Sequence, residues 1–395
     1  MRVVVVAEWY PSPADPVHGF WAHRQAVAAR DAGAEVHVLA MRRPVPPLST
    51  LRALPDADPI RRWAAGVRDH LSEWELDGIR VTPVPFVSPP RPRSYGSWGH
   101  WMAPTLGRAL DRLRREWPFE LVHAHSIVPP GHAAARWRRR RGARLAVSAH
   151  GPDMIHVADL SGVARRASVA ALTGADLVMA NSRWAERRCE EIAGRPLPSE
   201  VVHLGTDVPE ELPERRDRPT IVTVAHLVAR KRHAVVLHAL ADLRGELDLD
   251  YLVIGDGPGR APLERLATDL GIGERVRFTG QLEHEHALAE ARRCHAYVMP
   301  GVEEPFGVAY VEAMAAGLPA IGTRGEGGPE DIAAAGEGML LVPPDDHRSL
   351  AAALAELFRN GSEELGMAAR ETVIRNFTWE RCGRATLAAY ERALA

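Results

Sequence analysis

A single lysine stands out in a chain that otherwise carries its positive charge on arginine. Of 49 basic residues 48 are Arg, and the exception is Lys231, which directly follows Arg230. An ammonium is a compact point charge that a guanidinium does not replace. Arg230 and Lys231 together could bind a diphosphate through charge-assisted contacts and stabilise it as a leaving group. Codon bias combined with chance is the alternative explanation of the isolated lysine.

Two glutamates, Glu304 and Glu312, lie in a segment whose ends are typical of a short helix. Pro305 suits the first helical position, and Gly317 followed by Pro319 suits the end. The free N–H groups and dipole at the start of such a helix favour an anion, commonly a phosphate. The glutamates would be roughly 12 Å apart along a helix, so they could bind a sugar and a ribose joined by a diphosphate. The alternative is an acidic cap at Glu304 and a solvated charge at Glu312.

Short apolar runs alternate with amphipathic stretches along the chain, which is the pattern of βαβ units and parallel sheets. The runs predict strands at 3–7, 35–40, 79–84, 120–124, 144–148, 176–180 and 201–204, and then at 220–224, 250–255, 275–279, 296–299, 319–322 and 339–342. Helices are expected between most of them, including 20–32, and two more, at about 362–376 and 379–393, close the chain. The segments 41–79 and 82–92 do not fit the alternation and predict loops or insertions.

At 395 residues the chain is too long for one ordinary core, so two domains are expected. The polar, proline-rich stretch 210–219 predicts the linker. It separates a first domain at 1–209 from a second at 217–378, and the helix at about 379–395 is expected to pack back on the first. The economical fold class is α/β, with two doubly wound parallel-sheet domains facing each other across a cleft. Ligands of such sheets bind beyond the carboxyl ends of the strands, where the segments of Lys231 and Glu304 both begin.

Composition and charge narrow the functional classes. An apolar share of 46% and a charged share of 25% are typical of a soluble globular chain, and the net charge of −2 gives no overall attraction to nucleic acid. Through Gly205 the chain has 28 arginines against 20 acidic residues, a charge of +8, and the remainder carries −10, which fits domains with different partners. No apolar run approaches the roughly 18 residues that span a bilayer, and the first one is too short for a signal peptide. Three scattered cysteines fit a reducing compartment, so a cytoplasmic protein is expected.

The common nucleotide and metal motifs are missing from the sequence. The first strand exits into 8–11 without the glycines of a dinucleotide fingerprint, and a P-loop needs a lysine directly after a glycine. The glycine-rich segment 255–259 follows a strand but predicts a tight turn. The histidines of 123–125 end a strand without converging carboxylates or cysteines, and 284–286 is interpreted as a solvated turn. Neither a metal nor a cofactor is therefore expected.

Taken together, several motifs resemble the retaining glycosyltransferases of family 4, which have the GT-B fold. The resemblance rests on the segment from Glu304 to Gly317 with Phe-Gly after its first Glu, on the strand and loop ending in Arg230-Lys231, and on 255–258. Shorter similarities extend it over nearly the whole chain, at 10–19, 122–125, 150–153, 203–207 and 377–379. It implies two facing Rossmann-like domains, the first binding the acceptor and the second a nucleotide sugar.

The resemblance also implies residues that bind the donor. Lys231, with Arg230 as its basic partner, would hold the diphosphate, and Glu312 would bind the ribose. Glu304 would bind the donor sugar and phosphate together with the backbone of Phe306, Gly307 and Val308. Where the family usually has Gly-Arg before its lysine, this chain has Ala-His at 225–226. Whether Arg230 or His226 supplies the missing charge stays open.

Residues of the first domain complete the implied site. His150 would reach the donor sugar near its anomeric carbon, so Glu304, Lys231 and His150 are the predicted catalytic residues. Gly19 would let a loop approach the phosphate and the acceptor. Asp153 and Trp21 are expected on the acceptor side.

The implied activity is transfer of a sugar from a nucleotide diphosphate sugar to an acceptor hydroxyl with retention, the departing phosphate taking the acceptor proton. The acceptor would be a glycan, a lipid-linked sugar or a small molecule, so polysaccharide or glycolipid assembly and secondary-metabolite synthesis both stay open. The alternatives are an epimerase or phosphorylase of the same fold, a pyridoxal-phosphate enzyme with Lys231 as Schiff base, and a non-catalytic sugar-nucleotide-binding module.

A basic run on a predicted helix, from Arg136 through Trp137 to Arg141, has two interpretations. One is a solvated helix end. The other is contact with anionic lipid head groups, which would place the protein on the inner face of the membrane and suit a lipid-linked acceptor. One short basic run without a set of base-stacking aromatics is weak evidence for a nucleic-acid-binding surface, so no nucleic-acid partner is expected.

Overall fold

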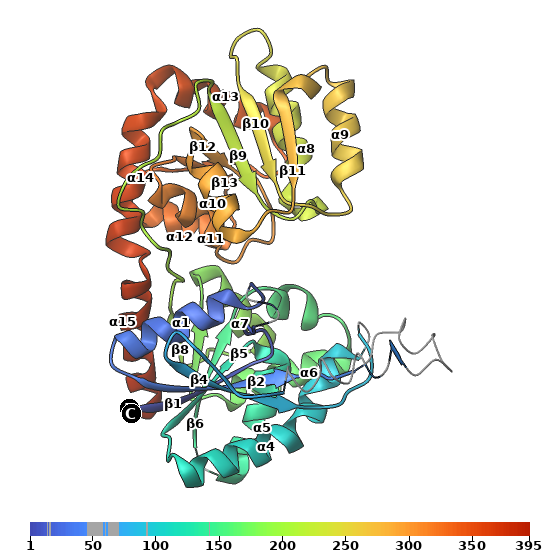
Figure 1. Ribbon diagram of the computed structural model, residues 1–395, viewed down its shortest axis with the longest axis vertical. Coiled ribbons are helices and arrows are strands. Elements are labelled where there is room, and N and C mark those ends of the chain that lie inside the picture. Colours follow the sequence, from blue (N-terminus) through green and yellow to red (C-terminus); the bar gives the residue numbers. More distant parts are fainter. Residues whose placement is uncertain are drawn as a thin grey trace. The chain divides into compact units, whose positions relative to one another are not determined.

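The computed structural model describes residues 1–45, 58–59, 61, 71–91, 94–141 and 143–395, apart from 14 and 16. The chain divides into two compact units, each with its own sheet (Figure 1). The first unit is Met1–His203 together with Cys382–Ala395, and the second is Leu204–Arg381. Within the described ranges, every helix is too short or too polar to traverse a lipid bilayer.

The first unit is built on an eight-stranded sheet of order β3-β4-β2-β1-β5-β6-β7-β8, and all neighbours are parallel except β3 and β4. Its strands are β1 (Arg2–Ala7), β2 (Glu35–Arg42), β3 (Trp74–Leu76), β4 (Ile79–Pro85), β5 (Leu121–His125), β6 (Arg144–Ala149), β7 (Leu177–Ala180) and β8 (Ser199–Val201). Its helices are α1 (Phe20–Asp31), α4 (Trp98–Glu116), α5 (His132–Arg141), α6 (Gly162–Gly174) and α7 (Arg183–Ala193).

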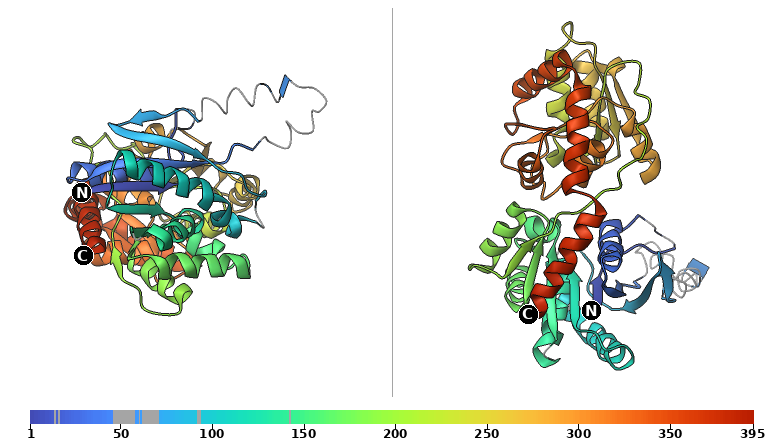
Figure 2. Two further views of the ribbon diagram at one scale, coloured as in Figure 1. Left: turned by 90° about the horizontal axis from the view of Figure 1, so that it is seen from below. Right: turned by 90° about the vertical axis from the view of Figure 1, so that its left-hand side faces the viewer.

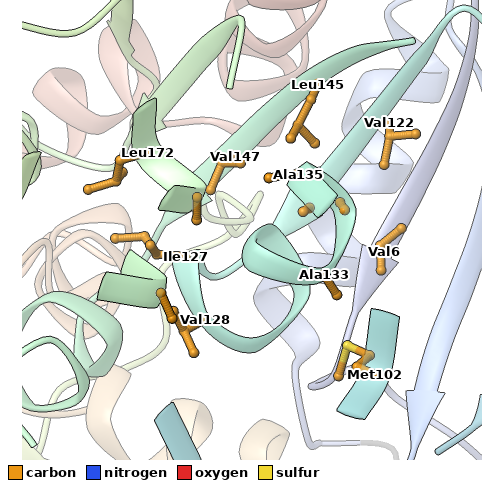
Figure 3. Close-up of a cluster of buried hydrophobic side chains, with 14 of the residues drawn as sticks. Val6, Met102, Val122, Ile127, Val128, Ala133, Ala135, Leu145, Val147 and Leu172 are labelled. Carbon is orange, nitrogen blue, oxygen red and sulfur yellow. The ribbon is translucent and has the colours of Figure 1, made fainter. Parts of the chain in front are cut away.

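The core of the first unit explains why β1 is central. A strand buried on both faces is apolar throughout instead of alternating, and residues 3–6 of β1 are all fully buried valines. On one face of the sheet, Val6, Val122 and Leu145 belong to the same buried cluster as Met102 of α4 (Figure 3). This packing fixes the strands whose carboxyl ends carry the loops described below.

The second unit has a six-stranded, wholly parallel sheet of order β11-β10-β9-β12-β13-β14. Its strands are β9 (Thr220–Val224), β10 (Asp250–Ile254), β11 (Val276–Gly280), β12 (Ala296–Val298), β13 (Ala320–Thr323) and β14 (Met339–Val342). Its helices are α8 (His233–Asp242), α9 (Arg260–Asp269), α10 (His284–Arg292), α11 (Val308–Ala315), α12 (Gly327–Ala335), α13 (His347–Asn360) and α14 (Ser362–Asn376), and α15 (Trp379–Leu394) follows. Two buried clusters divide its core, and in Figure 1 each face of the sheet carries helices.

The predicted alternation is confirmed, since each predicted strand overlaps an observed one. The prediction of a loop at 82–92 was wrong for its first part, because β4 continues to Pro85. Its neighbour β3 pairs only as far as Val81, so beyond that point one side of β4 is an edge, where proline is tolerated. Most of the predicted insertion at 41–79 lies outside the described residues, and its described part contains β3, which the sequence did not predict.

The predicted linker at 210–219 is irregular but belongs to the second unit, which begins at Leu204. Arg215 donates to the carbonyls of Ala316 and Gly317 at 2.9 and 3.0 Å, and Arg216 forms an ion pair with Glu290 at 2.5 Å. These contacts hold the segment against the second unit.

The last helix, α15, belongs to the first unit from Cys382 onward. The amide of Gln25 donates to Thr386 Oγ1 at 3.1 Å, and His123 Nδ1 lies 2.8 Å from the hydroxyl of Tyr390. A Cβ at Gly383 would lie 2.2 Å from the carbonyl oxygen of Ala28, so only glycine permits this approach. Both chain ends therefore lie in the first unit (Figure 2).

Candidate functional site

Two neighbouring strands bring the predicted donor residues of the second unit to one edge. Strands β9, β12 and β13 are adjacent and parallel, so the loops that follow them leave the same side of the sheet. The loop after β9 contains Arg230 and Lys231 in a short 3₁₀ turn, and the loop after β12 contains Glu304. The structure therefore brings these segments together at the carboxyl edge, where doubly wound sheets bind ligands.

Lys231 and Glu304 form an ion pair, with the ammonium Nζ on the carboxylate Oε2. Their side chains are only 12% and 9% exposed, so the pair is largely shielded from water. Arg230 Nη1 lies 3.8 Å from the same carboxylate oxygen and donates to the carbonyl of Glu303 at 3.3 Å. Arg232 points elsewhere, because it pairs with Asp345 at 2.7 Å. Two cations thus share the carboxylate of Glu304.

The helix after Glu304 begins later than predicted. We expected its first position at Pro305, but α11 starts at Val308, because Gly307 has a left-handed φ of 78° that cannot continue a helix. Phe306 is buried, with its ring 5.9 Å from that of Phe377. Glu304 therefore lies in the loop before α11, and the distance predicted along one helix does not apply to it.

The loop after β13 holds Glu304 in place, and the sequence did not predict this part of the site. Glu326 Oε2 accepts a hydrogen bond from the backbone N–H of Glu304 at 3.0 Å, and Gly328 N–H donates to the carbonyl of Glu304 at 3.2 Å. A Cβ at Gly328 would lie 1.6 Å from the carbonyl oxygen of Phe306. Burial raises the pKa of the Glu326 carboxyl. The glycines at 325, 327 and 328, directly after a strand, were the signal that could have revealed this support.

Glu312, the predicted ribose ligand, lies on α11 and has a partner. His284 Nε2 of α10 lies 3.7 Å from its Oε1, and the Glu312 side chain is 16% exposed. Burial raises the pKa of the Glu312 carboxyl. The interpretation of 284–286 as a solvated turn was wrong, because α10 begins at His284.

The glycine-rich segment 255–259 makes a tight approach to the loop after β9. Added Cβ atoms would lie 2.1 Å from the carbonyl oxygen of Ala225 at Gly255, and 2.7 Å from that of Leu227 at Gly257. His226 is exposed, and its Nδ1 lies 3.4 Å from the carbonyl of Asp256. Of the two basic candidates left open above, it is Arg230 that lies beside Glu304.

In the first unit Gly19 allows a close approach of two backbone segments. It has a φ of 81°, and a Cβ there would lie 2.2 Å from the carbonyl carbon and oxygen of Trp9. Gly19 also precedes α1 and so fixes where that helix starts beside the end of β1. Its predicted contact with phosphate and acceptor stays a prediction.

His150 lies at the carboxyl edge of the first sheet, just after β6, in a row of imidazoles. Its Nε2 is 2.9 Å from Nδ1 of His125, and the two rings stack with centroids 5.0 Å apart. Burial lowers the pKa of both rings, so both are neutral near pH 7. Nδ1 of His150 is buried and has no hydrogen-bond partner within the described part of the chain.

The two predicted acceptor-side residues differ in their surroundings. Trp21 of α1 is 36% exposed, and its ring lies 6.4 Å from that of His150. Asp153 is buried, and its carboxylate accepts backbone N–H bonds from Ile127 and Gly151 at 2.9 Å and from His150 at 3.3 Å. Its oxygens therefore join the loop after β5 to the loop that carries His150, and its predicted contact with the acceptor stays a prediction.

The basic run on α5 is only partly available to a membrane. Trp137 is buried and donates to Asp111 at 2.9 Å, while Arg138 donates to the carbonyls of Ala143 and Gly174 and pairs with Asp176. Arg136 and Arg139 are exposed. Across the described ranges, no three His, Cys, Asp or Glu side chains gather closely enough to hold a metal ion.

Comparison with known proteins identifies the family. Residues 19–210 match the family described as Glycosyltransferase Family 4, and residues 206–372 match the one described as Glycosyl transferases group 1. A GDP-mannose-dependent α-(1-6)-phosphatidylinositol monomannoside mannosyltransferase of Mycobacterium tuberculosis is 31% identical over 306 residues, which cover 70% of this chain and 77% of the relative. The chain belongs to the glycosyltransferases of family 4.

Further likenesses of this family-4 glycosyltransferase support the same conclusion about its fold. A 2-deoxystreptamine glucosyltransferase of Streptomyces kanamyceticus is 29% identical over 360 residues, covering 80% of this chain and 89% of the relative. The structure of a sucrose-phosphate synthase from Thermosynechococcus elongatus superposes with a TM-score of 0.76 over 99% of both chains, at 20% identity. The fold is GT-B, with two Rossmann-like units.

Proposed function

We propose that this glycosyltransferase moves a hexose from a nucleotide diphosphate sugar to an acceptor hydroxyl with retention of the anomeric configuration. The observation that carries the proposal is the contact of Lys231 with Glu304 beyond the carboxyl ends of β9 and β12. An ammonium suits a diphosphate, and a carboxylate suits the hydroxyls of a sugar. Both groups stand where a doubly wound sheet receives a nucleotide.

The donor site is proposed to work by exchange of partners. In the free protein Glu304 neutralises Lys231, and on binding the donor diphosphate takes the place of the carboxylate. The released Glu304 then accepts hydroxyl protons of the sugar. Arg230 remains beside the diphosphate, and the backbone of Phe306, Gly307 and Val308 at the start of α11 offers N–H groups to its oxygens. Glu312 is proposed to bind the ribose hydroxyls.

The transfer step is proposed to occur on one face of the sugar. The acceptor oxygen bonds to the anomeric carbon as the bond from that carbon to the diphosphate oxygen breaks. The departing phosphate oxygen takes the acceptor proton, so nucleoside diphosphate and glycoside are the two products. Lys231 and Arg230 stabilise the negative charge that develops on the leaving group. His150, neutral because burial lowers its pKa, is proposed to bind the donor sugar through Nδ1, since its Nε2 lies against His125.

Two classes of acceptor are compatible with the family. The mycobacterial relative acts on a phosphatidylinositol monomannoside, and the streptomycete relative on 2-deoxystreptamine. We propose that the first unit binds the acceptor, with the exposed face of Trp21 beside His150. For a lipid acceptor, Arg136 and Arg139 are the exposed cations that would contact anionic head groups.

The proposal is tested by thermal-shift screening against a panel of nucleotide diphosphate sugars, with Lys231→Ala and Arg136→Ala measured in parallel. We expect one donor to raise the melting temperature, Lys231→Ala to abolish the shift, and Arg136→Ala to leave it unchanged. NMR of the product from an α-donor should then show an α-linkage. An inverted anomer contradicts retention, and donor binding without turnover on any acceptor or water indicates a binding module.

A further inference from the structure

A pocket of about 430 Å³ opens at the carboxyl edge of the first sheet. Its lining residues lie at or beyond the ends of three neighbouring strands. Glu8 and Trp9 follow β1, Met41 and Arg42 end β2, and Arg91 lies beyond β4. Arg43, His18 and Trp98 complete the lining. The volume is in the range of small-molecule sites. His150 and His125 follow or end strands of the same sheet, so the pocket shares its edge with them.

The lining carries three guanidinium groups and one carboxylate. Arg91 pairs with Glu8, which is 11% exposed and also accepts from the hydroxyl of Tyr95 at 2.8 Å. Burial raises the pKa of the Glu8 carboxyl, and it lowers that of the His18 imidazole, which is therefore neutral near pH 7. Neither Arg42 nor Arg43 lies within ion-pair distance of any carboxylate that the structure describes. The pocket thus has a surplus of positive charge.

Arg42 and Arg43 are held in place by uncharged groups, whereas Arg91 is held by Glu8 and by aromatic rings. Arg43 donates through Nε to Ser88 Oγ and through Nη2 to the Ser88 carbonyl, both at 2.8 Å. Arg42 donates to the carbonyl of Tyr10 at 3.0 Å, and its buried Nε has no partner among the described residues. Arg91 lies over the rings of Tyr95, Trp98 and Trp9, with distances to their centroids of 4.2, 4.8 and 4.9 Å.

Such an arrangement is preorganised for an anion with several oxygens. Fixed planar guanidinium groups bind phosphate oxygens in pairs, and little side-chain entropy remains to be lost on binding. The volume exceeds that of a phosphate alone, so a ring attached to the phosphate would also be enclosed. An amine in the same place would meet uncompensated like charges.

We propose that this pocket binds a phosphate ester on the acceptor, and that the enzyme therefore glycosylates phosphorylated acceptors in preference to neutral or amine-bearing ones. The inference rests on the proposed glycosyl transfer and adds its acceptor class. The phosphate would come either from a soluble sugar phosphate or from a phospholipid head group. Arg42, Arg43 and Arg91 are the residues that determine this specificity.

The test compares three ligands that share the same sugar ring, namely glucose 6-phosphate, glucose and glucosamine. Each is titrated calorimetrically into the whole protein. We expect glucose 6-phosphate to bind, and the other two to bind at least roughly tenfold more weakly. Arg43→Gln and Arg91→Gln should each weaken the phosphate ester roughly tenfold. Glu8→Gln should strengthen binding of glucose 6-phosphate, since it removes the carboxylate that competes with the phosphate for Arg91. A pocket of purely structural role would not gain affinity. Arg108→Gln, an exposed arginine of α4, is the matched control and should change nothing.

Vesicles of phosphatidylcholine with and without phosphatidylinositol distinguish the two sources of phosphate. Sedimentation that needs phosphatidylinositol and is lost in Arg43→Gln but kept in Arg136→Gln assigns a lipid head group. Binding of glucose 6-phosphate alone assigns a soluble acceptor. If neither probe binds, if the three rings bind equally, or if the arginine variants retain affinity, the inference is overturned.

The outcome for the pocket is separable from that for the donor site. Lys231→Ala should lose nucleotide binding while keeping glucose 6-phosphate, and Arg43→Gln should do the reverse. If nucleotide binding depends on Lys231 but no phosphate ester binds, only the inference of a phosphorylated acceptor is refuted. If the phosphate ester binds but no nucleotide sugar does, the proposed sugar transfer is refuted, and only anion binding by the pocket is supported.

Discussion

Exchanging Glu304 for Gln should separate donor binding from sugar transfer. In the free protein the carboxylate of Glu304 holds the ammonium of Lys231, with both side chains nearly buried. A diphosphate must displace that carboxylate, so the ion pair competes with the donor. Glu304→Gln keeps the shape of the side chain and removes its charge. We therefore expect tighter binding of nucleoside diphosphate and slower transfer of sugar.

The magnitude follows from the bonds exchanged. A hydrogen bond to a charged group contributes about 1.5–3 kcal/mol, roughly twice a neutral one. Replacing the carboxylate by an amide should lower the cost of freeing Lys231 by about 1 kcal/mol, which is roughly fivefold in affinity. Lys231→Ala removes a charge-assisted bond to the diphosphate and should weaken binding by roughly 10- to 150-fold. Because Glu304 is proposed to hold the donor sugar through charge-assisted hydrogen bonds, kcat of Glu304→Gln should fall at least roughly tenfold.

The assay is calorimetric titration of nucleoside diphosphate, with transfer rates measured on the same preparations. Arg218→Ala is the control. Arg218 lies just before the start of β9, at the opposite edge of the sheet, and forms an exposed ion pair with Asp248. It should alter neither affinity nor rate. If Glu304→Gln weakens nucleoside diphosphate as much as Lys231→Ala does, the ion pair is a structural unit and the exchange of partners is refuted.

Three further measurements test other parts of the structure. Gly19→Ala should destabilise the first unit by at least about 3 kcal/mol in urea denaturation, because its Cβ would overlap the backbone of Trp9. Gly194→Ala is the control: Gly194 has a φ of 70° and open space around it, so the loss should be only about 1 kcal/mol. Equal losses would contradict the close approach of Gly19 to Trp9. Stability should fall as pH drops below about 6.5, by up to about 1.4 kcal/mol per pH unit for each buried histidine, since the unfolded chain takes up protons that the folded rings do not. Burial lowers the pKa of the rings concerned to about 3 (His123) and about 4 (His37, His132 and His233), and a flat stability profile between pH 6 and 4 would contradict this account. Treatment with EDTA should leave transfer activity unchanged if Lys231 and Arg230 stabilise the leaving group, and loss of activity restored by a divalent cation would show otherwise.

Much of the fold could be predicted because its signals are local. The fully buried run at β1 and the alternation after it are set by residue type along the chain, and the ends of α1 and α14 fall within one residue of the predicted 20–32 and 362–376. The meeting of Lys231 and Glu304 could also be predicted, although they are far apart in sequence. Each follows a strand, and the carboxyl ends of parallel strands share one edge.

The parts that could not be predicted depend on contacts between segments. Pro305 is a good first residue of a helix, but the left-handed Gly307 and the carbonyl of Phe306 packed on Gly328 delay α11 to Val308. Asp153 carries the charge expected of a ligand, and only the structure shows its oxygens bonded to backbone N–H groups. In both cases tertiary contacts outweigh local propensity.

The distribution of charge shows why local surroundings decide the chemistry. The second unit's part of the sequence is acidic as a whole, yet in its candidate site two cations, Arg230 and Lys231, lie beside the buried carboxylate of Glu304. The first 205 residues are strongly basic, but many of their arginines are used up by structural pairs such as Arg138 with Asp176. What distinguishes Arg42 and Arg43 is that they line a pocket and form no ion pair with a carboxylate that the structure describes, although Asp15 and Glu8 act on them at longer range. An uncompensated cation held rigidly in a pocket has unfavourable self-energy until an anion arrives. The same physical reason therefore selects Lys231 for the donor diphosphate, once Glu304 is displaced, and the arginine pocket for a phosphate on the acceptor.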